Sequence, residues 1–117
     1  MTRDPEPKRE VGLESIRGTP HWMAPEVIRG EGHGVAADIW SLGCTFIEIG
    51  SGEAPWSQLS NVFASMYKIA HSEETPALPA AFSESLKNLL RCCFMRQPAE
   101  RPSASALLQQ PFLAGGG

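Results

Sequence analysis

The sequence lacks the features that would place it among nucleic-acid-binding, secreted or membrane-spanning proteins. Its 117 residues carry a formal net charge of −3, and the basic residues are scattered rather than clustered as a nucleic-acid surface requires. No apolar run approaches the roughly 20 residues of a membrane span. The charged opening MTRDPEPKRE has no apolar core of a signal peptide. These absences predict one soluble cytoplasmic domain with no nucleic-acid partner and no membrane contact.

Cysteine and histidine are sparse, which argues against a metal centre. The three cysteines form no C-x-x-C pair, and the three histidines lie too far apart in the sequence for ligand spacing. Cys44 and Cys93 fall on the apolar faces of predicted helices, so we expect them to be small core residues. No metal site is predicted.

No stretch alternates apolar and polar residues as a half-buried strand does, so the chain is predicted to be all-α. Pro25 can begin a short helix that Gly30 ends. Residues 35–50, VAADIWSLGCTFIEIG, are apolar around the whole helix axis, which predicts a helix buried on all sides. Gly43 is tolerated within it if another segment approaches closely there. The expected stop signals for this helix are Gly50, Gly52 and Pro55.

Three further helices are predicted to be amphipathic. Ser83 and Ser103 are the expected N-caps of the last two. The apolar face of the first is expected to contain Val62, Phe63, Met66, Ile69 and Ala70. The second has apolar residues at the same spacing, namely Phe82, Leu86, Leu89, Leu90, Cys93 and Phe94.

Four short motifs carry a family resemblance. GTPHWMAPE, ADIWSLGC, APW and RQPAERPSASALLQQPF stand in the order and spacing of the C-terminal lobe of a eukaryotic Ser/Thr protein kinase. The sequence is most similar to MAP kinase kinase kinases, and the resemblance covers residues 15–113. It implies the helical C-terminal lobe of the kinase fold, truncated, with no N-lobe and no catalytic loop. Residues 1–14 would be a partial activation loop or a disordered segment, and residues 114–117 a flexible tail.

The resemblance also assigns three structural residues. Glu26 in A-P-E would pair with Arg101, whose planar guanidinium can hold a carboxylate through two hydrogen bonds. This pair would join the end of the activation segment to the base of the lobe. Asp38 would accept backbone N–H groups of a catalytic loop that the sequence does not contain. The alternative for Asp38 is a first-turn acid favoured by the helix dipole, and for Glu26 and Arg101 two exposed charges.

The substrate-binding residues implied by the resemblance are Gly18, Thr19, Pro20 and Trp22. Thr19 is typical of kinases that phosphorylate serine or threonine. Ser15 matches the activation phosphosite of many family members, although it is equally compatible with an unmodified serine in a polar loop. His21 stands where tyrosine is commoner.

Phosphoryl transfer needs a glycine-rich loop, a strand lysine, a catalytic H-R-D and a D-F-G, and the sequence contains none of them. We therefore expect no catalytic, ATP-binding or Mg²⁺-binding residue in this chain; both cofactors belong to the complete kinase. The expected function is that of a Ser/Thr kinase fragment, inactive alone, whose complete form phosphorylates a downstream kinase such as a MAP kinase kinase.

Two alternatives remain open. One is a non-catalytic binding module or scaffold that presents the substrate loop and the helix around Phe63 and Met66. The other is a degenerate product that never folds. Because upstream kinase segments would wrap the long buried helix, the isolated chain is expected to be marginally stable, dynamic or dependent on a partner such as the missing kinase segment.

Overall fold

The computed structural model describes residues 20–57, 59 and 61–115. Within these residues all regular structure is helical, which confirms the all-α prediction. The expectations for residues 1–14, Ser15, Gly18 and Thr19 lie outside the described residues, as do residues 116–117 of the predicted tail.

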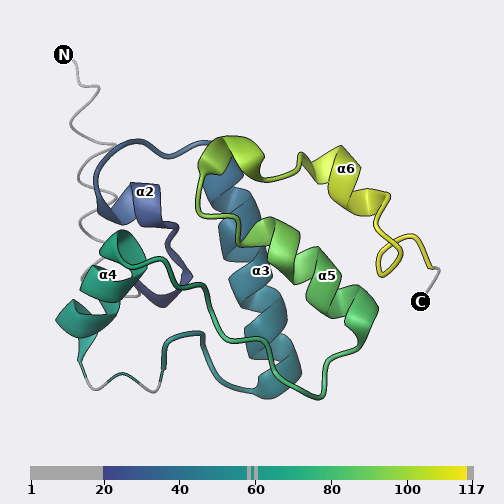
Figure 1. The fold of residues 1–117 in the computed structure, drawn as a ribbon, viewed down its shortest axis with the longest axis horizontal. Helices are drawn as coiled ribbons and strands as arrows, with labels where there is room; N and C mark the ends of the chain where they lie inside the picture. Colours follow the sequence, from purple (N-terminus) through teal and green to yellow (C-terminus); the bar gives the residue numbers. More distant parts are fainter. Residues whose placement is uncertain (1–19, 58, 60, 116–117) are drawn as a thin grey trace, which may run out of the picture.

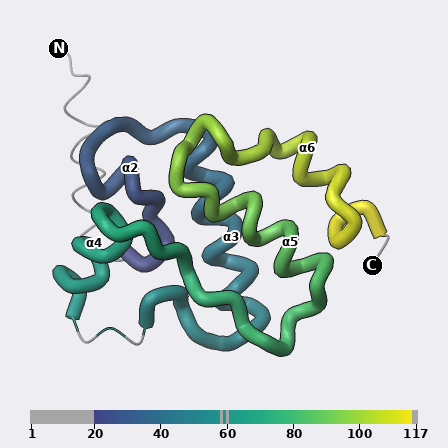
Figure 2. Tube along the Cα trace, in the orientation of Figure 1, coloured from purple at the N-terminus to yellow at the C-terminus, as the bar shows by residue number. Residues whose placement is uncertain are grey.

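The long helix α3 (Val35–Ser51) runs through the middle of the molecule (Figure 1). The short 3₁₀ turn η1 (Pro20–Trp22) and helix α2 (Pro25–Ile28) precede it, and α2 and α4 (Val62–His71) lie on one side. Helix α5 (Glu84–Cys93) lies on the other side. The chain then passes through η2 (Pro98–Glu100) to α6 (Ala104–Leu108), at the far end from α4. Figure 2 shows the segment after α4 crossing α3 to reach α5.

Local capping chemistry sets the helix ends. The side chains of Ser83 and Ser103 accept hydrogen bonds from the Leu86 and Ala106 amides, each at 3.1 Å, which confirms both predicted N-caps. Gly52 ends α3 in the left-handed conformation with φ 81°, where a side chain would be strained. Gly50, expected to help end the helix, instead lies inside it, and the Phe82 ring occupies the space that a Cβ at this position would fill.

The core lies between α3 and α5. Trp40 and Phe94 meet edge to face, with ring centroids 5.1 Å apart. A Cβ at Gly43 would come within 2.9 Å of the Phe94 ring, so the glycine allows the close approach that the sequence predicted. Cys44 and Cys93 are both fully buried here, as expected, and burial raises the pKa of each thiol.

Two expectations about burial were wrong. Helix α3 is not buried on all sides: Val35 is 68% exposed, Leu42 40% and Ile49 78%. These residues are spaced by seven and therefore share one stripe, and the described segments pack on the other side of the helix. Phe63, placed on the apolar face of α4, is 77% exposed. The buried residues of α4 are Ser65, Ile69 and Ala70. The buried hydroxyl of Ser65 is satisfied by donating a hydrogen bond to the Asn61 carbonyl at 3.3 Å.

In the portion of the chain that the structure describes, no helix is both long and apolar enough to cross a membrane.

Candidate functional site

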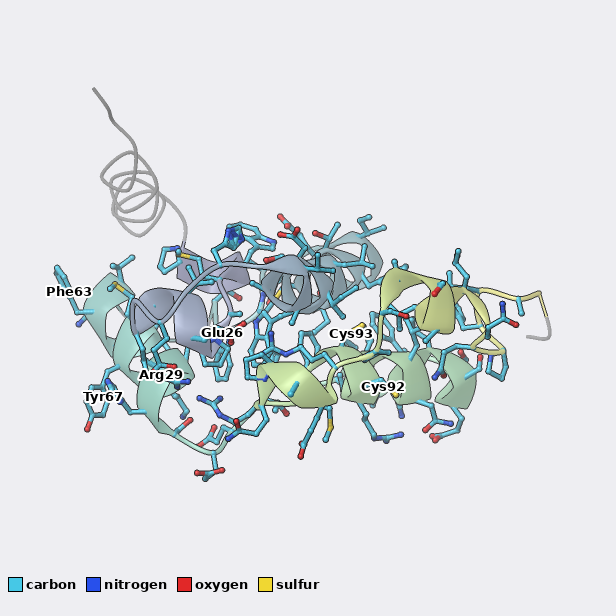
Figure 3. The ribbon with its side chains drawn as sticks, turned by 90° about the horizontal axis from the view of Figure 1, so that it is seen from above. Glu26, Arg29, Phe63, Tyr67, Cys92 and Cys93 are labelled. Carbon is cyan, nitrogen blue, oxygen red and sulfur yellow. The ribbon has the colours of Figure 1, made fainter. Side chains whose placement is uncertain are left out.

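The structure brings together two residues that are 75 positions apart in the sequence. Arg101 Nη1 donates to Glu26 Oε2 at 2.8 Å, and Nη2 donates to Oε1 at 2.9 Å. Both side chains are buried, the guanidinium completely. Glu26 therefore lies in the interior between α2, α3 and the segment before η2 (Figure 3). This two-point geometry is the strong form of an arginine–carboxylate pair.

All five guanidinium N–H groups of Arg101 have an acceptor. Besides the two bonds to Glu26, they reach the main-chain carbonyls of Met95 at 2.7 Å, Ala36 at 2.8 Å and Arg96 at 3.3 Å. The guanidinium also lies 5.1 Å from the centroid of the Trp40 ring. Because a buried charge is tolerated only when it is paired and hydrogen-bonded, this full set of acceptors lets the pair stay in the core. It fixes α2 to the start of α3 and to the segment after α5.

Three hydrogen bonds hold η1 against its surroundings. Trp22 Nε1 donates to Glu48 Oε1 at 3.0 Å, and Ser41 Oγ donates to the Trp22 carbonyl at 2.6 Å; both partners lie on α3. His21 Nδ1 donates to the Pro55 carbonyl at 3.0 Å, and because a carbonyl only accepts, Nδ1 carries the proton. Pro20 is buried and Trp22 is partly buried. The other implied substrate residues, Gly18 and Thr19, and the phosphosite Ser15 lie outside the described residues.

Asp38 lies apart from this interior network. Its side chain is 71% exposed, and His33 Nε2 lies 3.3 Å from Oδ1. Asp38 occupies the same stripe of α3 as Val35 and Leu42, three residues after one and four before the other. The structure thus sets this carboxylate on the uncovered side of α3 and away from Glu26 and Arg101.

The sequence reasoning missed two arginines that bind the C-terminal end of α4. Arg29, at the end of α2, donates to the Ala70 carbonyl at 2.6 Å. Arg96 donates to the carbonyls of Ile69 and Glu74. The last carbonyls of a helix have no partner within the helix and carry partial negative charge, so cations are favoured there. Motif matching could have flagged Arg96, which lies five residues before Arg101.

The surroundings shift the pKa values of these two arginines in opposite directions. The side-chain hydrogen bond between Arg29 and Glu31 raises the pKa of the guanidinium and lowers that of the carboxyl group. Its two contacts are Nε to Oε2 at 2.9 Å and Nη2 to Oε1 at 3.1 Å. Burial lowers the pKa of Arg96. The Arg29 guanidinium therefore binds Glu31 and the Ala70 carbonyl of α4 at the same time.

The contacts described above hold α2, α3, α4 and the segment after α5 in fixed positions relative to one another. Among the described residues no cluster of three or more histidine, cysteine or acidic side chains can hold a metal ion. The sequence also has no H-R-D, D-F-G or glycine-rich nucleotide loop. We therefore assign no step of phosphoryl transfer to the residues that the structure describes.

Comparison with known families defines the class. The family model described as "Protein kinase domain" matches residues 2–113. Because this match covers nearly the whole chain, the chain belongs to the protein kinase domain family, and the helical fold agrees with its C-terminal lobe.

Within this family, the chain is similar to several MAP kinase kinase kinases. The chain is 47% identical over 101 residues to mitogen-activated protein kinase kinase kinase A of Dictyostelium discoideum, covering 86% of this chain and 11% of that protein. It is 48% identical over 100 residues to mitogen-activated protein kinase kinase kinase 3 of Arabidopsis thaliana, covering 85% and 16%. It is 48% identical over 101 residues to mitogen-activated protein kinase kinase kinase 19 of Mus musculus, covering 86% and 8%. The chain therefore spans less than a fifth of the length of these relatives.

Proposed function

We propose that this chain forms the substrate-seating part of a Ser/Thr protein kinase domain. The complete domain transfers the γ-phosphate of ATP to a serine or threonine of a protein substrate. The observation that carries the proposal is the Glu26–Arg101 pair, which ties α2 to the residue directly after η2 and, through the Ala36 carbonyl, to the start of α3. The relatives named mitogen-activated protein kinase kinase kinases support a MAP kinase kinase as the substrate.

The proposed role of each residue follows from its place in the chain. Gly18, Thr19, Pro20 and Trp22 seat the substrate residue beside the phosphoacceptor, and Thr19 favours a serine or threonine acceptor. The bonds of Trp22 to Glu48 and Ser41 support this role, because they limit the movement of η1 relative to α3. A phosphate on Ser15 would add nearly two negative charges to the segment before η1 and activate the kinase. ATP and Mg²⁺ bind to parts of the domain outside this sequence, so the chain alone is inactive.

A chimeric kinase tests the proposal. Residues 15–113 replace the corresponding segment of the Dictyostelium relative, and the purified chimera is assayed for phosphate transfer to a generic peptide containing serine or threonine. We expect transfer by the chimera, none by the 117-residue chain, and a large loss in the Arg101→Ala chimera. An inactive chimera that is folded would contradict the proposal, as would turnover by the chain alone. The unmodified relative and a chimera without its catalytic-loop aspartate are the controls.

The second candidate function is a non-catalytic binding module or scaffold in the cytoplasm. The observation that favours it is the absence of nucleotide and catalytic motifs from the sequence. On this alternative the purified chain binds a protein partner stoichiometrically, while the chimera gains no activity from residues 15–113. The chimera assay therefore separates the two functions.

A further inference from the structure

We propose that Thr75 is a phosphorylation site whose phosphate binds in a cationic pocket beside α5. Thr75 is exposed and lies in the irregular segment between α4 and α5. The pocket, called the Thr75 pocket below, has a volume of about 230 Å³. Two arginines and three apolar residues complete its wall, so that the full lining is Thr75, Leu78, Arg91, Phe94, Met95 and Arg96. The hydroxyl-bearing residue and two cations therefore surround one space.

Both arginines of the Thr75 pocket have donors to offer to an anion. Arg96 donates to two main-chain carbonyls, and its remaining N–H groups have no acceptor among the described residues. Arg91 donates to Asn88 Oδ1 at 2.6 Å. Within the described part of the chain neither arginine forms an ion pair with a carboxylate, unlike Arg101, which binds Glu26. Two guanidinium groups without a carboxylate partner favour a phosphate, because its oxygens match their planar geometry.

The charges around the Thr75 pocket also favour an added anion. Burial lowers the pKa of Arg96, and the nearby cations Arg29 and Arg101 lower it further, whereas Glu73 raises it. A phosphate beside Arg96 would offset the repulsion among these three arginines. Glu74 already forms an ion pair with a lysine of α4 at 3.2 Å, and Glu73 is exposed, so solvent and salt weaken the repulsion between these two carboxylates and a phosphate.

The local backbone presents Thr75 as an acceptor. Residues that precede a proline are restricted to extended conformations, and Thr75 precedes Pro76. Pro76 is buried, which anchors the segment, while Thr75 itself is exposed. The Thr75 hydroxyl is therefore accessible from solvent at a fixed point of the fold.

The modification is an ordinary phosphoryl transfer from ATP by a separate protein kinase. A bond forms between Thr75 Oγ1 and the γ-phosphorus, the bond from that phosphorus to ADP breaks, and the hydroxyl proton passes to the catalytic base of the acting kinase. The product adds nearly two negative charges and three acceptor oxygens. Binding of these oxygens by Arg91 and Arg96 would join the segment after α4 to α5 and to the turn that follows it.

Treatment with a proline-directed serine/threonine kinase tests the site, because any enzyme that modifies Thr75 must accept proline after the acceptor. The 117-residue chain is incubated with this kinase and Mg·ATP. Mass spectrometry locates the phosphate, which is necessary because Thr19 also precedes a proline. We expect phosphate on Thr75. Thr45 is the matched control and should stay unmodified: it is also exposed, but it lies inside α3 and its hydroxyl donates to the Ser41 carbonyl at 3.1 Å.

A phosphorus-31 NMR titration of the phosphorylated chain tests the Thr75 pocket. The second pKa of a phosphothreonine is ordinarily about 6, so we expect a midpoint near pH 5 in the folded chain and about pH 6 in urea, since nearby cations lower it. Arg91→Ala should move the folded midpoint about halfway back, to roughly pH 5.5, whereas Arg91→Lys keeps the charge and should retain most of the effect. Arg91 is exposed, so its replacement should leave the fold intact. Lys87→Gln is the matched control, because Lys87 is a cation of α5 outside the pocket lining, and its midpoint should equal that of the wild type.

Several results would overturn the proposal. Absence of phosphate from Thr75, or equal modification of Thr45, excludes the modification site. A midpoint that is the same in the folded and the urea-unfolded chain, that Arg91→Ala leaves unchanged, or that Lys87→Gln shifts as much as Arg91→Ala, excludes the Thr75 pocket as the place where the phosphate binds. Inorganic phosphate is the last probe: if it binds to the unmodified chain while the kinase leaves Thr75 unmodified, the pocket takes a free anion instead.

Discussion

Replacement of Arg101 by alanine removes the donor side of the most deeply buried polar contact described in this chain. The Arg101 side chain is fully buried, and its five N–H groups bind the Glu26 carboxylate and three main-chain carbonyls. After the substitution, the Glu26 carboxylate remains in the core with its cation gone. Removing one partner of a buried ion pair costs about 3–5 kcal/mol, mainly because the remaining charge is left without compensation.

The loss is large compared with the stability of a small domain, which is about 5–15 kcal/mol in total. Urea unfolding followed by circular dichroism measures it, and a domain of this size should lose about 10 °C or more in Tm. Arg101→Lys should lose less, because lysine keeps the charge but offers three donors from one point instead of a planar fork. Arg91→Ala is the control: Arg91 is exposed and donates to Asn88 on the same helix, so its loss should stay within about 0.5 kcal/mol.

A double-mutant cycle separates the ion pair from other effects of the substitution. Glu26→Leu and Arg101→Met are each expected to be destabilising, but the double variant should lose less than the two single losses together, since it leaves no unpaired charge. It should still be less stable than the wild type, because the carbonyls of Met95, Ala36 and Arg96 lose their donors. Additive single losses, or a loss below about 1 kcal/mol for Arg101→Ala, would refute the reasoning.

Two further predictions concern the interface between α3 and α5. Gly43→Ala should cost about 1–2 kcal/mol of unfolding free energy, since its Cβ would meet the Phe94 ring at 2.9 Å, an overpacking that exceeds the gain in helix propensity. Thr45→Ala on the exposed side of α3 is the control, and equal stability of both variants in urea would contradict the prediction. The second concerns pH: burial raises the pKa of Cys93 to about 11 and that of Cys44 further, from an ordinary value of 9.0. Above pH 9 the unfolded chain releases both thiol protons while the folded protein keeps them, so stability should fall as the pH rises from about 9 to 11. Urea unfolding across this interval measures the slope, which Cys93→Ala should reduce; an identical slope in that variant would exclude the thiol as a cause.

Local chemistry made the helices predictable. Ser83 and Ser103 mark the starts of α5 and α6 because a hydroxyl before an apolar repeat satisfies an amide of the first turn. Gly52 marks the end of α3 because only glycine adopts the left-handed conformation there without strain. Each signal acts within four residues of the sequence and needs no knowledge of the tertiary structure.

The long-range contacts were less accessible to sequence reasoning. The pairing of Glu26 with Arg101 was predicted from a family resemblance. No local pattern could predict it, because the two residues are 75 positions apart in the sequence. The contacts of Arg29 and Arg96 have main-chain carbonyls as acceptors. Since every residue carries a carbonyl, no side-chain pattern identifies the acceptor, even where a motif marks the arginine, as it does for Arg96. The exposure of Phe63 was mispredicted for a related reason, because the spacing of Phe63 and Ile69 does not tell which side of a helix meets its neighbours.

Val35, Leu42 and Ile49 form an exposed apolar stripe on α3, and this stripe is a surface that a partner could cover. Burying a valine, leucine or isoleucine side chain contributes about 1.5–3 kcal/mol, so covering the exposed fractions of Val35, Leu42 and Ile49 would contribute roughly 3–5 kcal/mol. That gain is comparable with the whole stability of a marginal domain. Asp38 lies within this stripe, so a segment that covers it also desolvates a carboxylate and must supply hydrogen-bond donors. A covering segment that pairs apolar side chains with free backbone N–H groups satisfies both demands. We propose that the remainder of a kinase domain provides it.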